Sequence, residues 1–320
     1  MTGPPHELPD DSIEQLIIAL DSLVDGDRAA EQLISLGPRV VPAVERFLVA
    51  SRPRSISVSR CRAVRILGAL GAYSSLTCYL RENIHPSDAT VLFAEDAVRS
   101  AAARELMRHE SSATFRVLLD AAKQRPTGGL VQALSQYRWP ECVPLLFDLL
   151  EDDLCREDAK EGLRRQPEAA RAYAILLLRG RTQLPIQGYE NSSRRRATLQ
   201  LLVEFGIGTN EWPDLRVFLE DEDRDCVISA ATLGLNFASA AERPTILSAM
   251  LDASAGMNWA QETMAVELLD KWPILGHQVA REIQAKHSKR GEKPNWLSPF
   301  WRILHHVLGD EMQGQKSGAV

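Results

Sequence analysis

The sequence has few aromatic residues, no excess of positive charge and no long apolar run. Aromatic residues make up 6% of its 320 residues, and 37 Lys and Arg face 43 Asp and Glu, a formal net charge of -6. Such a chain has no general attraction for nucleic acid or anionic membranes. No apolar run approaches the roughly 18 residues that a membrane span needs. We therefore expect a soluble protein and expect neither nucleic acid nor a membrane as its partner.

Motifs for metal or nucleotide chemistry are also missing. The sequence has no C-x-x-C, H-E-x-x-H or EF-hand loop, and no P-loop, G-x-G-x-x-G or G-x-S-x-G. Glu105 and His109 supply only two possible metal ligands on one helical face. His305 and His306 point about 100° apart if they lie on a helix. The sequence predicts no metal site, no cofactor and no catalytic residue.

The cysteines and the first residues indicate a compartment. The five cysteines are odd in number, widely spaced and mostly within apolar stretches, as structural thiols are in a reducing compartment: Cys61, Cys78, Cys142, Cys155 and Cys226. Residues 1–11 are rich in proline and acid and lack the basic and apolar regions of a secretory signal. We expect a cytoplasmic protein.

Helical periodicity with small residues recurs along the chain. In 226–238, the residues Val227, Ala230, Ala231 and Gly234 fall on one stripe of a 3.6-period helix. Similar stripes recur at steps of about 26 to 39 residues, which is the range of helical repeat proteins. No run shows the sustained alternation of strands. The pattern predicts an all-α protein.

More strongly apolar segments alternate with these stripes, so each unit is predicted to be a helical hairpin. Pro42, Pro140, Pro213 and Pro244 lie near the start of the apolar helices, where the missing N–H is tolerated. Acidic turns follow, and we expect Asp153 and Asp223 there to cap the next helix. About nine helix pairs are predicted: 12–24 with 27–36, 38–50 with 58–70, 73–84 with 94–108, 111–123 with 127–137, 140–151 with 154–165, 168–179 with 190–206, 212–220 with 224–238, 241–253 with 258–271, and 274–287 with 295–308. Three stretches interrupt them and are predicted to be loops: 51–59, 179–193 and 287–295.

An apolar helix with an early proline, an acidic turn and a helix with a small-residue stripe resemble HEAT repeats. The likeness is best seen over 212–237 and extends to 27–48 and 61–80. The resemblance implies a right-handed α-α superhelix, an α-solenoid. We expect a single repeat domain over 11–309, with disordered tails at 1–10 and 310–320.

Charge is segregated along the chain. Residues 160–196 hold nine basic and three acidic side chains, and 39–65 hold seven and one. Residues 1–27 hold seven acidic and no basic side chains, and 211–225 hold seven acidic and two basic ones. This segregation has two interpretations: either the arginines bind a partner, or they pair with acidic turns of the neighbouring repeat.

The resemblance implies a non-catalytic scaffold or adaptor that binds another protein or an extended peptide along the concave face, which the second helix of each hairpin lines. Two enzymatic alternatives within HEAT-like architecture stay open, namely an alkylpurine DNA glycosylase and a phycobilin lyase. The sequence leaves the oligomeric state undecided. Candidate contact residues are six arginines on predicted second helices and one tyrosine in a predicted loop: Arg62, Arg65, Arg99, Arg194, Arg195, Arg196 and Tyr189.

Overall fold

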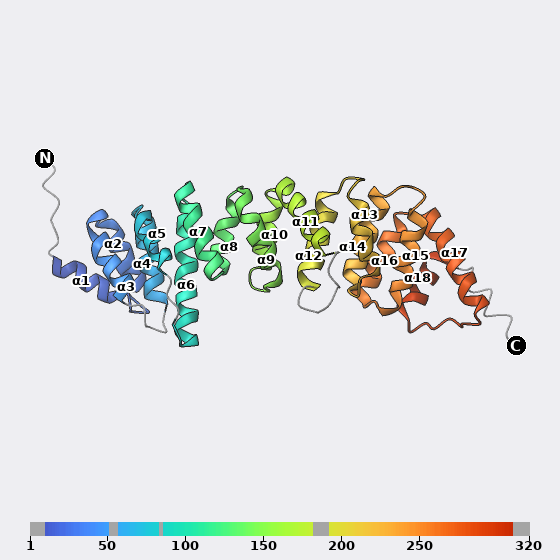
Figure 1. Cartoon of the computed structure of the whole chain (residues 1–320). Helices are drawn as coiled ribbons and strands as arrows, with labels where there is room; N and C mark the ends of the chain where they lie inside the picture. Colours follow the sequence, from blue (N-terminus) through green and yellow to red (C-terminus); the bar gives the residue numbers. More distant parts are fainter. Residues whose placement is uncertain (1–9, 51–56, 83–85, 182–191, 310–320) are drawn as a thin grey trace, which may run out of the picture. The chain divides into compact units, whose positions relative to one another are not determined.

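The computed structural model of the chain describes residues 10–50, 57–82, 86–181 and 192–309 (Figure 1). These residues form α-helices joined by turns and short 3-10 segments, and this described part contains no strand. The all-α prediction is confirmed. The helices divide into two compact units, unit 1 up to Gln166 and unit 2 from Pro167, and each is described by itself. The single domain predicted over 11–309 stays a prediction.

Unit 1 contains ten α-helices within its described residues. They are α1 (Asp10–Ala19), α2 (Gly26–Ser35), α3 (Val41–Ala50), α4 (Val58–Ala69), α5 (Tyr73–Arg81), α6 (Ala89–Leu106), α7 (Ser112–Gln124), α8 (Gly128–Gln136), α9 (Val143–Asp148) and α10 (Arg156–Arg164).

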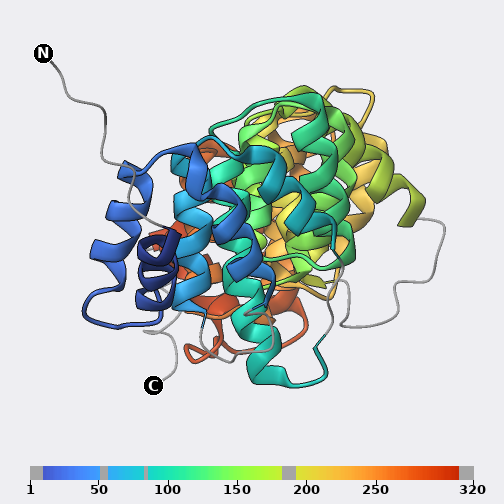
Figure 2. The ribbon, with the colours of Figure 1, turned by 90° about the vertical axis from the view of Figure 1, so that its left-hand side faces the viewer.

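Packing in unit 1 is sequential. Each odd-numbered helix packs on the even-numbered helix that follows it, from α1 on α2 to α9 on α10. The even-numbered helices also contact one another in order, α2 on α4, α4 on α6, α6 on α8 and α8 on α10. We call this series the second-helix row. Figure 2 shows the first pair, α1 and α2, with no other helix of unit 1 in front of it.

Unit 2 follows the same scheme. Its elements are α11 (Pro167–Arg181), α12 (Ser192–Phe205), α13 (Trp212–Leu215) continued by the 3-10 segment η5 (Arg216–Glu220), α14 (Arg224–Phe237), α15 (Arg243–Ala253), α16 (Trp259–Asp270), α17 (Pro273–Lys289) and α18 (Pro299–Leu308). The helices α12, α14, α16 and α18 contact one another in order, and α15 packs on α17. Their shared apolar stripes form the core, as the buried Val227, Ala230 and Ala231 of α14 illustrate.

Helix starts follow from local chemistry. Pro213 and Pro244 occupy the first turn of α13 and α15, and Pro140 opens a 3-10 turn before α9. The Asp223 side chain accepts a hydrogen bond from the backbone N–H of Asp225 and caps α14, as predicted. The prediction for Asp153 is wrong. It is Asp152 whose carboxylate accepts from two backbone N–H groups before α10, because the chain turns one residue earlier.

Asp153 instead pairs with Arg156, at 2.6 Å. Parts of the predicted tails and of two predicted loops lie outside the described residues, namely 1–9, 51–56, 182–191 and 310–320. Asp10, assigned to the first tail, is the first residue of α1.

Candidate interaction surface

Arg62 fastens α4 to the turn between α1 and α2. Its guanidinium donates to the carbonyl oxygens of Leu20 and Ser22, both at 2.8 Å, and to Asp27 Oδ1 at 3.1 Å. A Cβ on Gly26 would lie 2.0 Å from this guanidinium, so the glycine makes room for it. Arg62 is 8% exposed. Its position inside the protein makes it a structural residue rather than a contact for a partner.

Arg99, on α6, is also buried and donates to the Ala121 carbonyl oxygen at 3.3 Å. Burial lowers the pKa of its guanidinium, and the neighbouring Tyr79 and Glu95 oppose that effect. Glu95 in turn pairs with the buried Arg60 of α4 at 2.7 Å. The interior of unit 1 therefore contains a charged network of its own.

In unit 2, Arg195 and Arg196 of α12 reach the acidic turn before α14. Arg195 contacts Asp221 twice, Nη2 to Oδ1 at 2.9 Å and Nε to Oδ2 at 2.7 Å. Burial would lower the pKa of the Arg195 guanidinium, but the hydrogen bond and charge of Asp221 raise it. Arg196 pairs with Asp223 at 2.7 Å and with Asp225 at 3.0 Å. Of the two interpretations of the charge segregation, pairing with a neighbouring acidic turn is what these side chains show.

The remaining three candidates differ in how far their side chains are exposed or described. Arg194 is half-buried on α12, and Tyr189 lies outside the described residues. Arg65 is 46% exposed on α4 and reaches Asp27 at 3.2 Å. Two of the described candidates are therefore partly exposed on second helices, namely Arg65, with 46% of its side chain exposed, and Arg196, with 42%.

Arg65 belongs to a set of exposed or half-exposed arginines on the second-helix row of unit 1. Arg104 of α6 donates to Gln132 of α8 at 2.9 Å, and Arg165, directly after α10, donates to Gln136 of α8. These bonds join successive helices of the second-helix row. Arg108 lies one turn beyond Arg104 and pairs with Glu105 at 2.8 Å. We call the set the arginine row: Arg65, Arg104, Arg108, Arg164 and Arg165.

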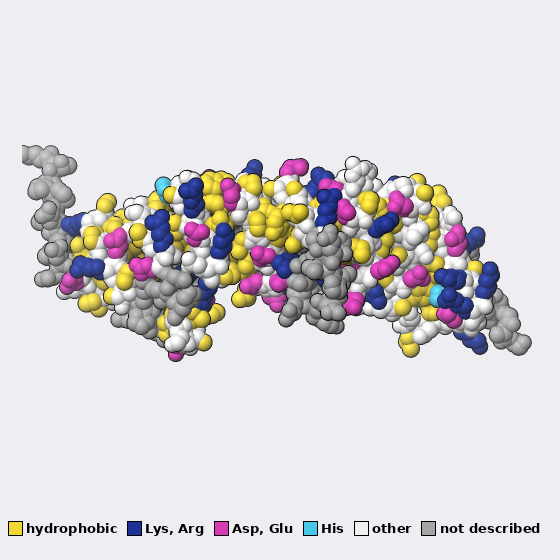
Figure 3. All heavy atoms as spheres, in the orientation of Figure 1, with side chains coloured by type: hydrophobic (Ala, Val, Ile, Leu, Met, Phe, Trp, Pro, Cys, Tyr) yellow, Lys and Arg dark blue, Asp and Glu magenta, His cyan; other side chains and the backbone are white. Residues whose placement is uncertain are grey.

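Four members of the arginine row are not among the residues predicted from the sequence, because counts of charge per segment do not show which arginines share a helical face. Helical spacing could have found two of them, since Arg104 and Arg108 are four residues apart and share a face. Figure 3 shows that basic and acidic side chains alternate over much of unit 1. Within the arginine row itself, Arg65 contacts Asp27 and Arg108 contacts Glu105, so these arginines have acidic neighbours.

The three tryptophans that precede a proline pack against other residues of the protein. Trp139 lies 4.4 Å from the ring of Phe115, and Trp212 is buried against Gly234, where an added Cβ would lie 2.5 Å from the indole ring. Trp272 lies under the guanidinium of Arg243 at 4.7 Å. These three indoles are therefore engaged inside hairpins, where the glycosylase alternative would need them in a groove.

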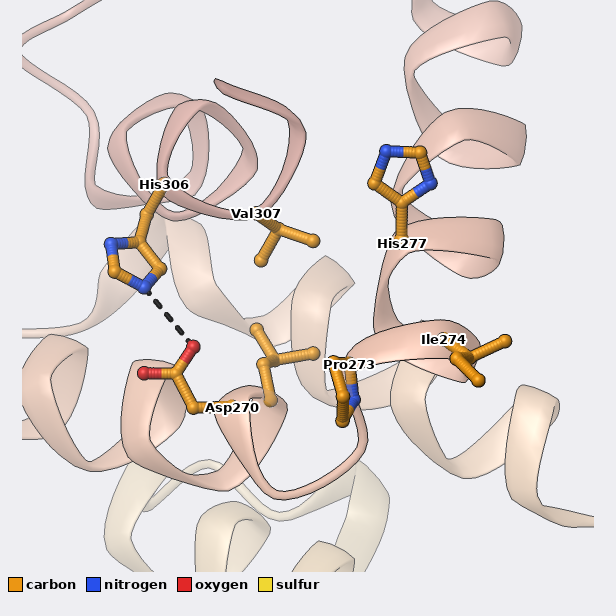
Figure 4. Close-up of a pocket in the computed structure, with 7 residues that line it drawn as sticks. Asp270, Pro273, Ile274, His277, His306 and Val307 are labelled. Carbon is orange, nitrogen blue, oxygen red and sulfur yellow. Dashed lines mark hydrogen bonds and ion pairs between the residues drawn. The ribbon is translucent and has the colours of Figure 1, made fainter.

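A cavity of about 480 Å³ lies among α16, α17 and α18 and brings His277, His306 and Asp270 to one surface (Figure 4). The His306 Nε2 atom lies 3.1 Å from the Asp270 carboxylate. Both side chains are about half exposed. An enzymatic pocket would instead hold a buried acid or nucleophile at its wall. Leu269, Pro273, Ile274 and Val307 complete the lining.

Three cysteines are buried, Cys142, Cys155 and Cys226, while Cys78 is exposed. Burial raises the pKa of all three buried thiols, to about 11 for Cys155. A raised thiol pKa disfavours the thiolate that would act as a nucleophile.

No group of three or more His, Cys, Asp or Glu side chains in the described ranges is placed to hold a metal ion. None of the helices in that same part of the chain combines the length and the apolar character of a membrane span. Comparison of the sequence with models of protein families and with curated proteins gave no match in either case.

Proposed function

We propose that the chain is a non-catalytic scaffold that binds an acidic segment of another protein along the arginine row. In this proposal the helical hairpins are HEAT-like repeats, about nine in number, and the second helices line the concave face of an α-solenoid. Sequential packing of hairpins within each unit supports the repeats, because hairpins of a repeat protein stack on their neighbours and bury their apolar stripes there.

The observation that carries the proposal is the exposure of Arg65 on α4, of Arg104 on α6 and of Arg108 just beyond the end of α6, since α4 and α6 are adjacent second helices. Burial raises the pKa of the Cys61 thiol, and the charge of the nearby Arg104 opposes that effect. Cys61 lies one turn from Arg65 on α4, which places Arg65 and Arg104 in the same region of unit 1. A guanidinium has five N–H donors in a planar fork. One that donates to Asp27 or Gln132 can therefore also engage a carboxylate of a partner.

Capture from nuclease-treated lysate tests the proposal. We expect the unmodified protein to retain discrete proteins that the triple variant R65E/R104E/R108E loses, and we expect salt to weaken the retention. A matched control is R81E/R116E/K123E, which makes the same charge change at exposed residues of α5 and α7. The control should retain the same proteins as the unmodified chain.

Two outcomes contradict the proposal. Equal loss from both triple variants would show a general effect of charge, and capture of material that nuclease removes would favour a nucleic-acid function. Circular dichroism and urea midpoints of both variants show whether they are folded, so a loss of binding can be assigned to the surface.

A further inference from the structure

The turn between α1 and α2 presents apolar and acidic side chains together. Ile18, Leu23 and Val24 are 72%, 82% and 88% exposed, and Asp21 and Asp25 are exposed beside them. Arg62 holds this turn through the carbonyl oxygens of Leu20 and Ser22, so its shape is fixed before any partner arrives. We call these five residues the acidic end: Ile18, Asp21, Leu23, Val24 and Asp25.

The last helix pair presents the opposite charge. Four exposed basic side chains follow one another at the end of α17 and just beyond it: Lys286, Lys289, Arg290 and Lys293. Figure 3 shows dark-blue side chains gathered over the end of α17, next to a histidine. Leu297, which precedes α18, is 88% exposed. We call these five residues the basic end.

The basic end is held as firmly as the acidic one. The ring of His287 lies 4.8 Å from Phe300 of α18, and its Nδ1 atom lies 2.5 Å from Glu292. The Glu292 N–H donates to the His287 carbonyl oxygen at 3.2 Å, which closes the turn after α17. Arg302 donates to the Leu297 carbonyl oxygen at 2.8 Å. Both ends are therefore preformed surfaces.

We propose that the acidic end of one copy binds the basic end of a second copy, so that the protein assembles head to tail. Each end combines exposed apolar surface with a net charge, and the two net charges are opposite: the acidic end has three large apolar side chains, and the basic end has Leu297. Contact between unlike ends of identical chains is heterologous, so it can extend into rings or filaments.

A second copy fits these residues better than nucleic acid does. The segment 286–293 contains Glu292 among its basic residues, and a phosphate backbone offers no apolar partner for Leu297. The acidic end supplies both the carboxylates and the apolar side chains. This inference is independent of the proposed function, because it leaves the arginine row available.

Sedimentation velocity over a range of concentrations tests the proposal with the full chain. We expect the average mass to rise above the 35.6 kDa of one chain as concentration increases, and to rise less at high salt. The variants D21K/D25K and K289E/R290E should each associate at least about tenfold more weakly, because like charges then face each other. L297S should weaken association as well.

Mixing the two charge-reversed variants gives the most specific test of the contact between unlike ends. D21K/D25K has two basic ends and K289E/R290E has two acidic ends, so an equimolar mixture should associate more strongly than either variant does alone. The control R116E/K123E, with its charge change on α7, should associate like the unmodified chain. Circular dichroism establishes that each variant is folded.

A mass that stays at one chain at every concentration would overturn the proposal, as would a mixture of folded variants that fails to associate. A fluorescent DNA oligonucleotide forms a further arm. Its binding to the basic end, lost in K289E/R290E and accompanied by no self-association, would assign the basic end to nucleic acid and reject the second copy as its occupant.

Discussion

Burial determines which arginines of this chain can meet a partner. Arg62, Arg99 and Arg195 point into their units, where a guanidinium deprived of water needs hydrogen bonds or a carboxylate from the protein itself. Arg65 and Arg104 lie on the same helices but face outward. A shift of one position in a helix turns a side chain by about 100°, so neighbouring arginines can have unrelated roles.

The Arg195–Asp221 pair should be essential for the stability of unit 2. The two side chains are 8% and 0% exposed, and Asp221 Oδ1 also accepts from the Asp223 backbone N–H at 2.8 Å. Asp221→Ala leaves a buried charge uncompensated, so we expect a loss of about 3–5 kcal/mol in the free energy of unfolding. Urea titration followed by circular dichroism measures it.

The exposed pair of Arg179 and Asp214 in the same unit provides the control. Its side chains are 49% and 39% exposed, so Asp214→Ala should cost less than about 1 kcal/mol. Equal losses from the two substitutions would show that burial of the ion pair is not what matters.

Cys155 should make the protein less stable at alkaline pH. Burial, with the charges of Asp152 and Asp158, raises the pKa of its thiol from 9.0 to about 11. The unfolded chain releases this proton first, so stability is complete below pH 9 and falls as the pH rises towards 11, by about 2–3 kcal/mol. Urea midpoints measured across this range should fall less steeply in Cys155→Ala. In Cys78→Ala, which alters an exposed thiol, an unchanged slope is expected.

Among the helices, the close approach of α8 to α6 depends on a glycine. In the second-helix row, a Cβ on Gly129 of α8 would lie 2.4 Å from the backbone oxygen of Ser100 on α6. Backbone cannot swing aside as a side chain can, so α8 and α6 would have to separate. Gly128, the residue before it, has only the Asp158 carboxylate near its Cβ position, at 4.0 Å.

We expect Gly129→Ala to destabilise unit 1 by about 1–3 kcal/mol through overpacking. Gly128→Ala should be neutral or stabilising by up to about 1 kcal/mol, because alanine has the higher helix propensity and meets only an ordinary contact. Thermal and urea unfolding of the two variants measure the difference. A Gly129→Ala protein as stable as Gly128→Ala would mean that α6 and α8 separate without cost.

The helices themselves were largely predictable. Pro213, Pro244 and Asp223 mark helix starts by local chemistry alone, and the structure has helices there. The prediction failed for α6, which begins at Ala89 instead of residue 94. The Asp88 carboxylate accepts from the Thr90 and Val91 N–H groups and so starts the helix earlier.

At the scale of the whole molecule, each unit has its own buried polar network. Arg60, Tyr79 and Glu95 form one in unit 1, and Arg195 and Asp221 form another in unit 2. Each network lies within one compact unit, and local openings of a protein follow local contacts. Damage to one network should therefore remain local.

Hydrogen exchange can show this separation. In Asp221→Ala, amide exchange should become faster in α12 and α14 and stay unchanged in α4 and α6, because local openings follow local contacts. Mass spectrometry of peptides from the folded protein resolves the two units. Equally faster exchange in α4 and α6 would show that the units unfold as one.

Sequence alone determined that this protein is helical and where several of its helices begin, because helical periodicity, prolines and acidic caps act over a few neighbouring residues. It also identified the charged segments of the chain that could contribute to an interaction surface. Tertiary structure decided which arginines are buried and which form the arginine row, because that depends on the rotation of each helix against its neighbours. It also exposed the acidic and basic ends, since no local pattern shows that Leu23 or Leu297 lacks cover from another helix.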